Sequence, residues 1–179
     1  MKIIGITGPQ SSGKGTVVDF LKSEGYEHLS VRSFLTDEII KRGLTIDRDN
    51  MRDVANDLRS KFGPSYIIEQ LFQKAKESGK PTIIESIRCV GEIETLRKES
   101  DFFLLGIDAD QKIRYERAIN RGSETDHISR QKFQEQENAE MNNSDPTKQN
   151  ISECMKMADL IITNNGTIAE FREKLLNSL

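Results

Sequence analysis

Residues 8–16 read GPQSSGKGT and directly follow a short apolar run at residues 3–6. The spacing Gly8-x4-Gly13-Lys14 matches the phosphate-loop pattern G-x-x-x-x-G-K-[ST], except that Gly15 replaces the usual Ser or Thr and Thr16 follows it. Glycines let backbone N–H groups converge on phosphate oxygens, while a helix N-terminus and a lysine add positive charge. The stretch therefore predicts a nucleotide phosphate site formed by Gly8, Ser11, Ser12, Gly13, Lys14, Gly15 and Thr16.

Apolar runs and helical patterns alternate along the chain. The runs that are typical of strands buried on both faces lie at residues 3–6, 82–84, 102–107 and 160–163, with a weaker fifth at 26–31. Helical spacing appears between them, for example in a helix whose apolar face includes Phe62 and that Gly63 and Pro64 end; Ser65 can cap the next helix. This alternation predicts an α/β fold with a doubly wound parallel sheet of five strands.

Composition limits the possible classes of protein. The 179 residues suffice for one domain, and the net charge of −3 argues against a protein that binds nucleic acid through overall charge. The two cysteines form no CxxC pair, which favours a reducing compartment, and the apolar run at 102–105 is far too short to span a membrane. We therefore expect a cytoplasmic protein that binds neither nucleic acid nor membrane. His28 and His127 have no spacing that suggests a metal site and are interpreted as structural.

Residues 122–150 differ from the rest of the chain. They contain six carboxylates, many Asn and Gln and few large apolar side chains. Such a segment is expected to be too polar to pack tightly against the core. It is either a solvated helical excursion or a mobile lid.

The run Gly13-Lys14-Gly15-Thr16 resembles the phosphate loop of adenylate kinases and related nucleoside monophosphate kinases. The resemblance implies an α/β P-loop NTPase fold with three layers, a central parallel five-stranded sheet and a helical lid. It also implies a single P-loop kinase domain over residues 1–179, with a substrate-binding helical insertion at about 31–79 and a lid at about 122–150. It also implies ATP and Mg²⁺ as cofactors and a small-molecule nucleotide as substrate.

A carboxylate and an arginine follow the strand at residues 82–84. Glu85-Ser86-Ile87-Arg88 is similar to the family's LDGFPR segment, with Glu85 in place of Asp. A carboxylate at the end of a buried strand beside a phosphate loop can orient hydrated Mg²⁺, which makes Thr16 and Glu85 the metal candidates. The forked guanidinium of Arg88 can hold a phosphate. Lys14, Glu85 and Arg88 are thus expected to be catalytic.

Further arginines recur at helical spacing. Arg114, Arg117 and Arg121 fall at i, i+3 and i+7, so one helix face presents all three. The resemblance implies that Arg117 and Arg121 are catalytic lid arginines, that Arg117 also binds the cofactor, and that Asn165 lies in the loop that touches adenine. The other residues expected to bind substrate are Ser30, Arg32, Arg52, Arg59 and Arg130.

Three functions stay open. The first is a nucleoside or deoxynucleoside monophosphate kinase that transfers the γ-phosphoryl group of ATP. The alternative is a dephospho-CoA kinase, since residues 128–130 and 158–166 resemble the end of that family, although GKGT stands in place of GKST and no Asp-rich stretch follows the second strand. The third is a non-catalytic nucleotide-binding regulatory module, against which the separate sets of arginines argue.

Overall fold

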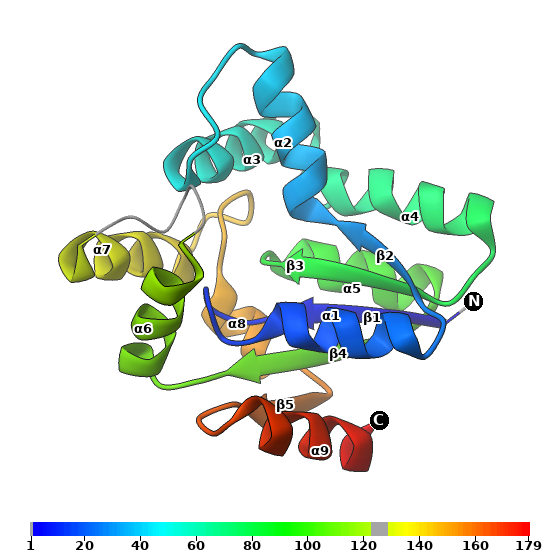
Figure 1. The fold of residues 1–179 in the computed structure, drawn as a ribbon. Coiled ribbons are helices and arrows are strands. Elements are labelled where there is room, and N and C mark those ends of the chain that lie inside the picture. Colours follow the sequence, from blue (N-terminus) through cyan, green and yellow to red (C-terminus); the bar gives the residue numbers. More distant parts are fainter. Residues whose placement is uncertain (1, 123–128) are drawn as a thin grey trace.

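A computed structural model describes residues 2–122 and 129–179. Within these ranges, five strands form one sheet in the order β2-β3-β1-β4-β5, and every neighbouring pair is parallel (Figure 1). The strands are β1 Lys2–Thr7, β2 Glu27–Ser30, β3 Thr82–Ile87, β4 Asp101–Asp108 and β5 Leu160–Thr163. The predicted α/β fold with a parallel five-stranded sheet is confirmed.

Helices connect the strands and cover both faces of the sheet. In the described residues these are α1 Lys14–Ser23, α2 Val31–Lys41, α3 Arg48–Phe62, α4 Tyr66–Ser78, α5 Val90–Glu99, α6 Gln111–Arg121, α7 Arg130–Met141, α8 Ile151–Lys156 and α9 Ile168–Ser178. Helices α6 and α7 lie beyond the carboxyl ends of the strands, and the chain's C-terminus lies toward the opposite end (Figure 1).

The alternation of side chains along each strand divides the core into two parts. On β1, Ile4 and Ile6 pack with α1 and α9, whereas Ile3 packs with α2 to α5 and α8 on the other face. All three side chains are at most 2% exposed. Because β1 lies between β3 and β4, the loop that follows it emerges where the strand order reverses, which is the usual ligand position in such sheets.

The described part of the polar segment, residues 129–150, packs against the rest of the molecule through α7, contrary to expectation. In α7, Phe133 is 1% exposed, and Gln136, Glu137 and Glu140 are at most 8% exposed. The two buried carboxylates are tolerated because arginines from other elements pair with them. The prediction was wrong because the sequence pattern does not show where a carboxylate finds its partner.

The end of α3 also departs from the expected pattern. Gly63 ends the helix with φ of 109°, as predicted, but Phe62 is 59% exposed and lies against the Tyr66 ring at 4.7 Å between centroids. Ser65 precedes α4, but its hydroxyl contacts Glu69 at 2.6 Å and does not cap the helix backbone. Within the described ranges, no helix has the length and apolar composition of a bilayer span.

Candidate functional site

The loop between β1 and α1 has a backbone that depends on its glycines. Gly8 has φ of 134°, and a Cβ there would lie 2.0 Å from the carbonyl oxygen of Ile107 on β4. Gly13 has φ of 112°, and its Cβ would lie 2.2 Å from Nδ2 of Asn164. Ser11 also has a positive φ, 56°. Side chains are thus excluded where the loop passes Ile107 and Asn164, as is typical of a loop that holds an anion with its backbone amides.

Lys14 is buried at the start of α1. It is 8% exposed, and its Nζ donates to the carbonyl oxygens of Gly8 at 2.9 Å and Pro9 at 2.7 Å. Burial, followed by the nearby Arg88 charge, lowers the pKa of Lys14 to about 7. Burial and nearby cations disfavour the charged form of Lys14. This suits a site that binds an anion, because the anion stabilises the ammonium.

The loop cavity, as we name it, has a volume of about 360 Å³. Its lining consists of Ser11, Gly13, Lys14, Gly15, Thr16, Asp19, Glu85, Arg117 and Arg121. The buried hydroxyls of Ser11 and Ser12 have no hydrogen-bond partner within the described part of the chain. Unpartnered hydroxyls, a buried lysine and two arginines fit the phosphates of a nucleotide. The structure thus brings five of the seven predicted loop residues to one cavity with Glu85, Arg117 and Arg121, whereas Gly8 and Ser12 do not line it.

Glu85 lies at the carboxyl end of β3 with its side chain 20% exposed. Burial opposes its ionisation, but the contact with His28 and the Lys14 charge outweigh burial and lower the pKa of Glu85. Nε2 of His28 on β2 lies 3.5 Å from Oε2 of Glu85, so this histidine adjoins the site. No group of three or more His, Cys, Asp or Glu side chains among residues 2–122 and 129–179 could hold a metal alone. The carboxylate of Glu85 and the hydroxyl of Thr16 could supply protein oxygens to a Mg²⁺ ion that also binds phosphate.

Arg117 connects α6 to the loop that follows β5. Its guanidinium donates to the carbonyl oxygens of Asn164 at 2.9 Å and Gly166 at 3.2 Å. Asn164 in turn donates from Nδ2 to the carbonyl oxygen of Ser12 at 2.9 Å. Asn165, which is expected to lie beside adenine, accepts a hydrogen bond from the Asp110 backbone at 2.8 Å. Asn164 is therefore the residue of this loop that contacts the phosphate loop.

Arg114 does not join the face formed by Arg117 and Arg121. It is 5% exposed and forms a two-point pair with Glu137 of α7, both bonds being 2.8 Å. The regular i, i+3, i+7 spacing did not reveal this difference, because only the tertiary structure shows that α7 covers the first of the three arginines.

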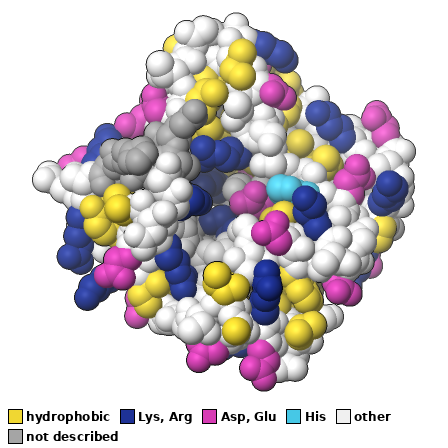
Figure 2. All heavy atoms as spheres, viewed as in Figure 1, with side chains coloured by type: hydrophobic (Ala, Val, Ile, Leu, Met, Phe, Trp, Pro, Cys, Tyr) yellow, Lys and Arg dark blue, Asp and Glu magenta, His cyan; other side chains and the backbone are white. Residues whose placement is uncertain are grey.

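A second cavity, which we call the arginine cavity, lies on the other side of the end of β3. It is lined by Val31, Arg32, Leu35, Arg48, Met51, Arg52, Arg59, Ser86, Arg88, Glu140 and Gln149. Figure 2 shows dark blue Lys and Arg side chains gathered in the central hollow of one face of the molecule. Four of the six residues expected to bind substrate meet here, namely Arg32, Arg52, Arg59 and Arg88.

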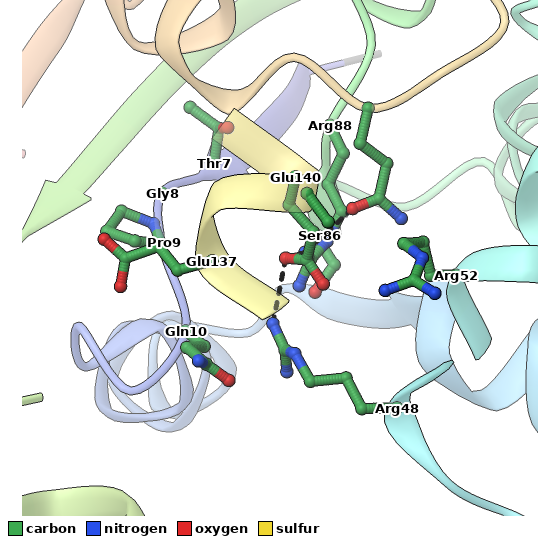
Figure 3. A network of polar contacts seen from close by, with 12 residues as sticks. Thr7, Gly8, Pro9, Gln10, Arg48, Arg52, Ser86, Arg88, Glu137 and Glu140 are labelled. Carbon is green, nitrogen blue, oxygen red and sulfur yellow. Dashed lines mark hydrogen bonds and ion pairs between the residues drawn. The ribbon is translucent and has the colours of Figure 1, made fainter. Parts of the chain in front are cut away.

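Arg88 shares a carboxylate with an arginine that the sequence analysis missed. Oε2 of Glu140 accepts from Nη2 of Arg48 at 2.9 Å and from Nη1 of Arg88 (Figure 3). Nη1 of Arg88 also donates to Oε1 of Gln149 at 3.2 Å. Burial opposes ionisation of Glu140, but the charges of Arg88 and Arg48 outweigh burial and hold its pKa below the usual value. Arg48 carried only the signal of lying one helical turn before Arg52.

Arg59 lies beneath the arginine cavity and is buried. It is 1% exposed and donates from Nη2 and Nε to Oε1 of Glu92 on α5 at 2.8 and 3.1 Å. Oε2 of Glu92 accepts the backbone N–H groups of Arg88 at 2.8 Å and Cys89 at 3.0 Å. The pair therefore supports the segment that carries Arg88.

Ser86 holds the backbone between the two cavities in an unusual conformation. Its φ is 70°, and the pairing of β1 with β3 shifts register there, since Ile6 pairs with Glu85 and Thr7 with Ile87. The Thr7 hydroxyl donates to the Ile87 carbonyl at 2.8 Å and fixes the irregularity. A strained residue of this kind is retained where the surrounding structure enforces it, often at a functional site.

The remaining predicted substrate residues lie elsewhere in the described chain. Ser30 caps α2, since its hydroxyl accepts the backbone N–H of Ser33 at 3.2 Å. Arg130 is exposed at the start of α7. Neither Ser30 nor Arg130 lines the loop cavity or the arginine cavity, as far as the structure describes them. His127 and the beginning of the expected lid, residues 123–128, lie outside the described residues.

Comparisons with known proteins found one matching family and similar proteins from other organisms. Residues 4–157 match the family described as AAA domain. A UPF0200 protein of Methanococcus vannielii is 31% identical over 183 aligned residues, which cover 100% of this chain and 95% of that protein.

Solved structures share the fold. TT1252 from Thermus thermophilus superimposes with a TM-score of 0.64 at 22% identity, covering 98% of this chain and 95% of its own. A gluconokinase from Sinorhizobium meliloti gives 0.59 at 15% identity, with 98% and 90% covered. Dephospho-CoA kinase from Campylobacter jejuni gives 0.53 at 18% identity, with 99% and 95% covered. The shared fold is kinase-like and contains a P-loop.

Proposed function

Because this chain belongs to the AAA domain family and to the UPF0200 proteins, and has a kinase-like P-loop fold, we propose that it is an ATP-dependent kinase. It transfers the γ-phosphoryl group of ATP to a small anionic acceptor. The acceptor that we favour is a nucleoside or deoxynucleoside monophosphate, as in adenylate kinase-like enzymes.

One observation carries this proposal: two consecutive residues face two different cavities. Glu85 lines the loop cavity, and Ser86 lines the arginine cavity. A donor phosphate on the loop and an acceptor anion among the arginines would therefore lie on the two sides of one strand end. Placing two reactants in this way is the main task of a phosphoryl-transfer enzyme.

The residues of the loop cavity have complementary tasks in the proposed reaction. The loop amides and Lys14 bind the donor phosphates, while Arg117 and Arg121 neutralise charge that develops during transfer. Thr16 and Glu85 would hold Mg²⁺, which would shield phosphate charge when bound. Arg88 orients the acceptor with its planar guanidinium.

The proposal also divides the chain into functional segments. Residues 31–79, which include α2 to α4, form the acceptor side. Residues 122–150 form the lid, of which α7 is the described helix. This lid contributes Glu140 directly to the arginine cavity.

An acceptor panel tests the function. ADP formation is measured with Mg²⁺ and ATP alone, and then with AMP, CMP, UMP, GMP, their deoxy forms or dephospho-CoA, with Lys14→Ala as the inactive control. We expect turnover that depends on one class of monophosphate. Turnover only with dephospho-CoA would support the alternative kinase, and ATP loss that is independent of every acceptor would contradict both.

A further inference from the structure

The arginine cavity contains an anion that belongs to the chain itself. Glu140, on the last turn of α7, is 3% exposed and lies between Arg48 and Arg88 (Figure 3). One oxygen of this carboxylate accepts from both arginines, which come from α3 and from the residue after β3. Glu140 therefore occupies the position in which an anionic ligand would meet both guanidinium groups.

The cavity stays positively charged even with Glu140 in place. Arg52 and Lys132 are balanced by Asp49 and Asp53, since Arg52 lies 3.0 and 3.1 Å from these carboxylates and Lys132 lies 3.0 Å from Asp49. Arg59 is balanced by Glu92. Glu140 compensates only one of its two arginines, and Arg32 forms no ion pair within the described residues. The lining thus has an excess of about two positive charges, which a single carboxylate does not neutralise.

Two buried guanidinium nitrogens of this cavity lack a hydrogen-bond acceptor. Nε of Arg48 and Nη1 of Arg59 have no partner in the part of the chain that the structure describes, and both side chains line the cavity. Leaving a buried donor unpaired costs about 1–3 kcal/mol. A phosphate group has three acceptor oxygens and about two negative charges, so it matches the surplus donors and charge better than a carboxylate does.

We propose that Glu140 is a specificity-determining residue of the arginine cavity, which selects dianionic oxyanions by making them compete with its own carboxylate for Arg88. A monoanion that takes the place of Glu140 at Arg88 only replaces one negative charge with another. It also lies next to the displaced carboxylate of Glu140, which repels it. A dianion gains the additional attraction of the cavity and can displace Glu140 from Arg88 while Arg48 retains it. The inference rests on the proposed function, in that the arginine cavity is taken as the acceptor site, and it assigns to that acceptor a phosphate monoester group.

Glu140→Gln tests this competition. Glutamine keeps the size and one acceptor oxygen of Glu140 but removes the negative charge. Binding of inorganic phosphate is measured by calorimetry at about pH 8, where phosphate is mostly dianionic. We expect the Kd to fall about tenfold or more, because a like charge next to the ligand has been removed.

Glu137→Gln is the matched control. Glu137 lies on the same helix and also forms a buried pair, but with Arg114, and it does not line the cavity. The Kd of the Glu137→Gln variant for phosphate should equal that of the native protein. Both measurements are repeated with Lys14→Ala, which weakens phosphate binding at the loop. The effect of Glu140→Gln should persist there, because the phosphate that it reports is bound to Arg88 in the arginine cavity.

An unchanged or higher phosphate Kd in Glu140→Gln would overturn the proposal, as would an equal gain in Glu137→Gln. If Glu140→Gln does not fold, the native protein still decides the matter: phosphate should bind and nitrate should not at equal ionic strength, and equal binding would refute the selection. Failure of the acceptor panel with the expected phosphate result would instead reject only the kinase function.

Discussion

At the scale of single residues, the ammonium of Lys14 is the group whose state a ligand would change most. It is bound to two carbonyl oxygens of its own loop, and its pKa is about 7 because of burial and the nearby Arg88 charge. A neutral lysine cannot attract phosphate, so a phosphate ligand must raise this pKa in order to use the charge.

Proton uptake on ATP binding follows from this pKa. Above about pH 7 free Lys14 is mostly neutral, and ATP restores the proton, so that binding at about pH 8 should take up close to one proton per site. At about pH 6 the lysine is already charged and uptake should disappear. Calorimetry in buffers of different ionisation enthalpy measures this number. Lys14→Arg, which stays charged, is the control, and equal uptake in that variant would assign the proton to another group.

Arg88→Lys separates the two ligands of the proposed reaction. Lysine keeps the charge but loses the planar fork, and a lost charge-assisted hydrogen bond costs about 1.5–3 kcal/mol. We expect acceptor affinity to fall by about ten- to a hundredfold. ATP affinity, measured without acceptor, should barely change. Weaker ATP binding with unchanged acceptor binding would place Arg88 on the donor side instead.

At the scale of elements, α3 is joined to α5 by a fully buried ion pair. Arg59 and Glu92 are each at most 1% exposed, and Glu92 also accepts the two backbone N–H groups that precede α5. Breaking such a pair leaves an uncompensated buried charge, whereas exposed pairs contribute little.

Arg59→Ala should therefore lower the free energy of unfolding by about 3–5 kcal/mol. Arg52→Ala is a control on the same helix, since Arg52 is 22% exposed and pairs only with carboxylates at the surface. Arg52→Ala should lower the free energy of unfolding by only about 0–1 kcal/mol. Urea unfolding without ligand measures both. Similar losses in the two variants would show that the buried pair adds no special stability.

At the scale of the whole molecule, α7 connects parts that are distant in sequence. It pairs with α6 through Glu137, with α3 and Arg88 through Glu140, and with α3 through Lys132, whose Nζ lies 3.0 Å from Asp49. Ion pairs of α7 thus join α3, α6 and Arg88 at one end of the sheet. A ligand bound there stabilises the native state as a whole.

ATP should therefore raise the melting temperature of the native protein. At a hundredfold excess over its Kd, the stabilisation is about 2.7 kcal/mol. Lys14→Ala should retain nearly the native melting temperature without ATP, because Lys14 contacts loop carbonyls and not the apolar core, but it should lose most of the ATP-dependent increase. A large loss of stability without ATP would instead identify Lys14 as a structural residue.

The sequence by itself determined the features that are encoded locally. Apolar runs specified the five strands, and the glycine spacing of residues 8–16 specified a loop whose backbone excludes side chains. These predictions succeeded because a buried strand requires a short run of apolar residues, and a positive φ favours glycine at that position.

Only the tertiary structure decided which charges meet. Glu140 lies 92 residues from Arg48 and 52 from Arg88, and Arg59 lies 33 from Glu92. Helical spacing placed Arg114 with Arg117, but Arg114 pairs with Glu137 of α7, and nothing in the sequence indicated that Asn164 contacts the phosphate loop. The physical reason is that an ion pair depends on distances of a few ångströms between side chains, which packing sets and a one-dimensional pattern does not contain.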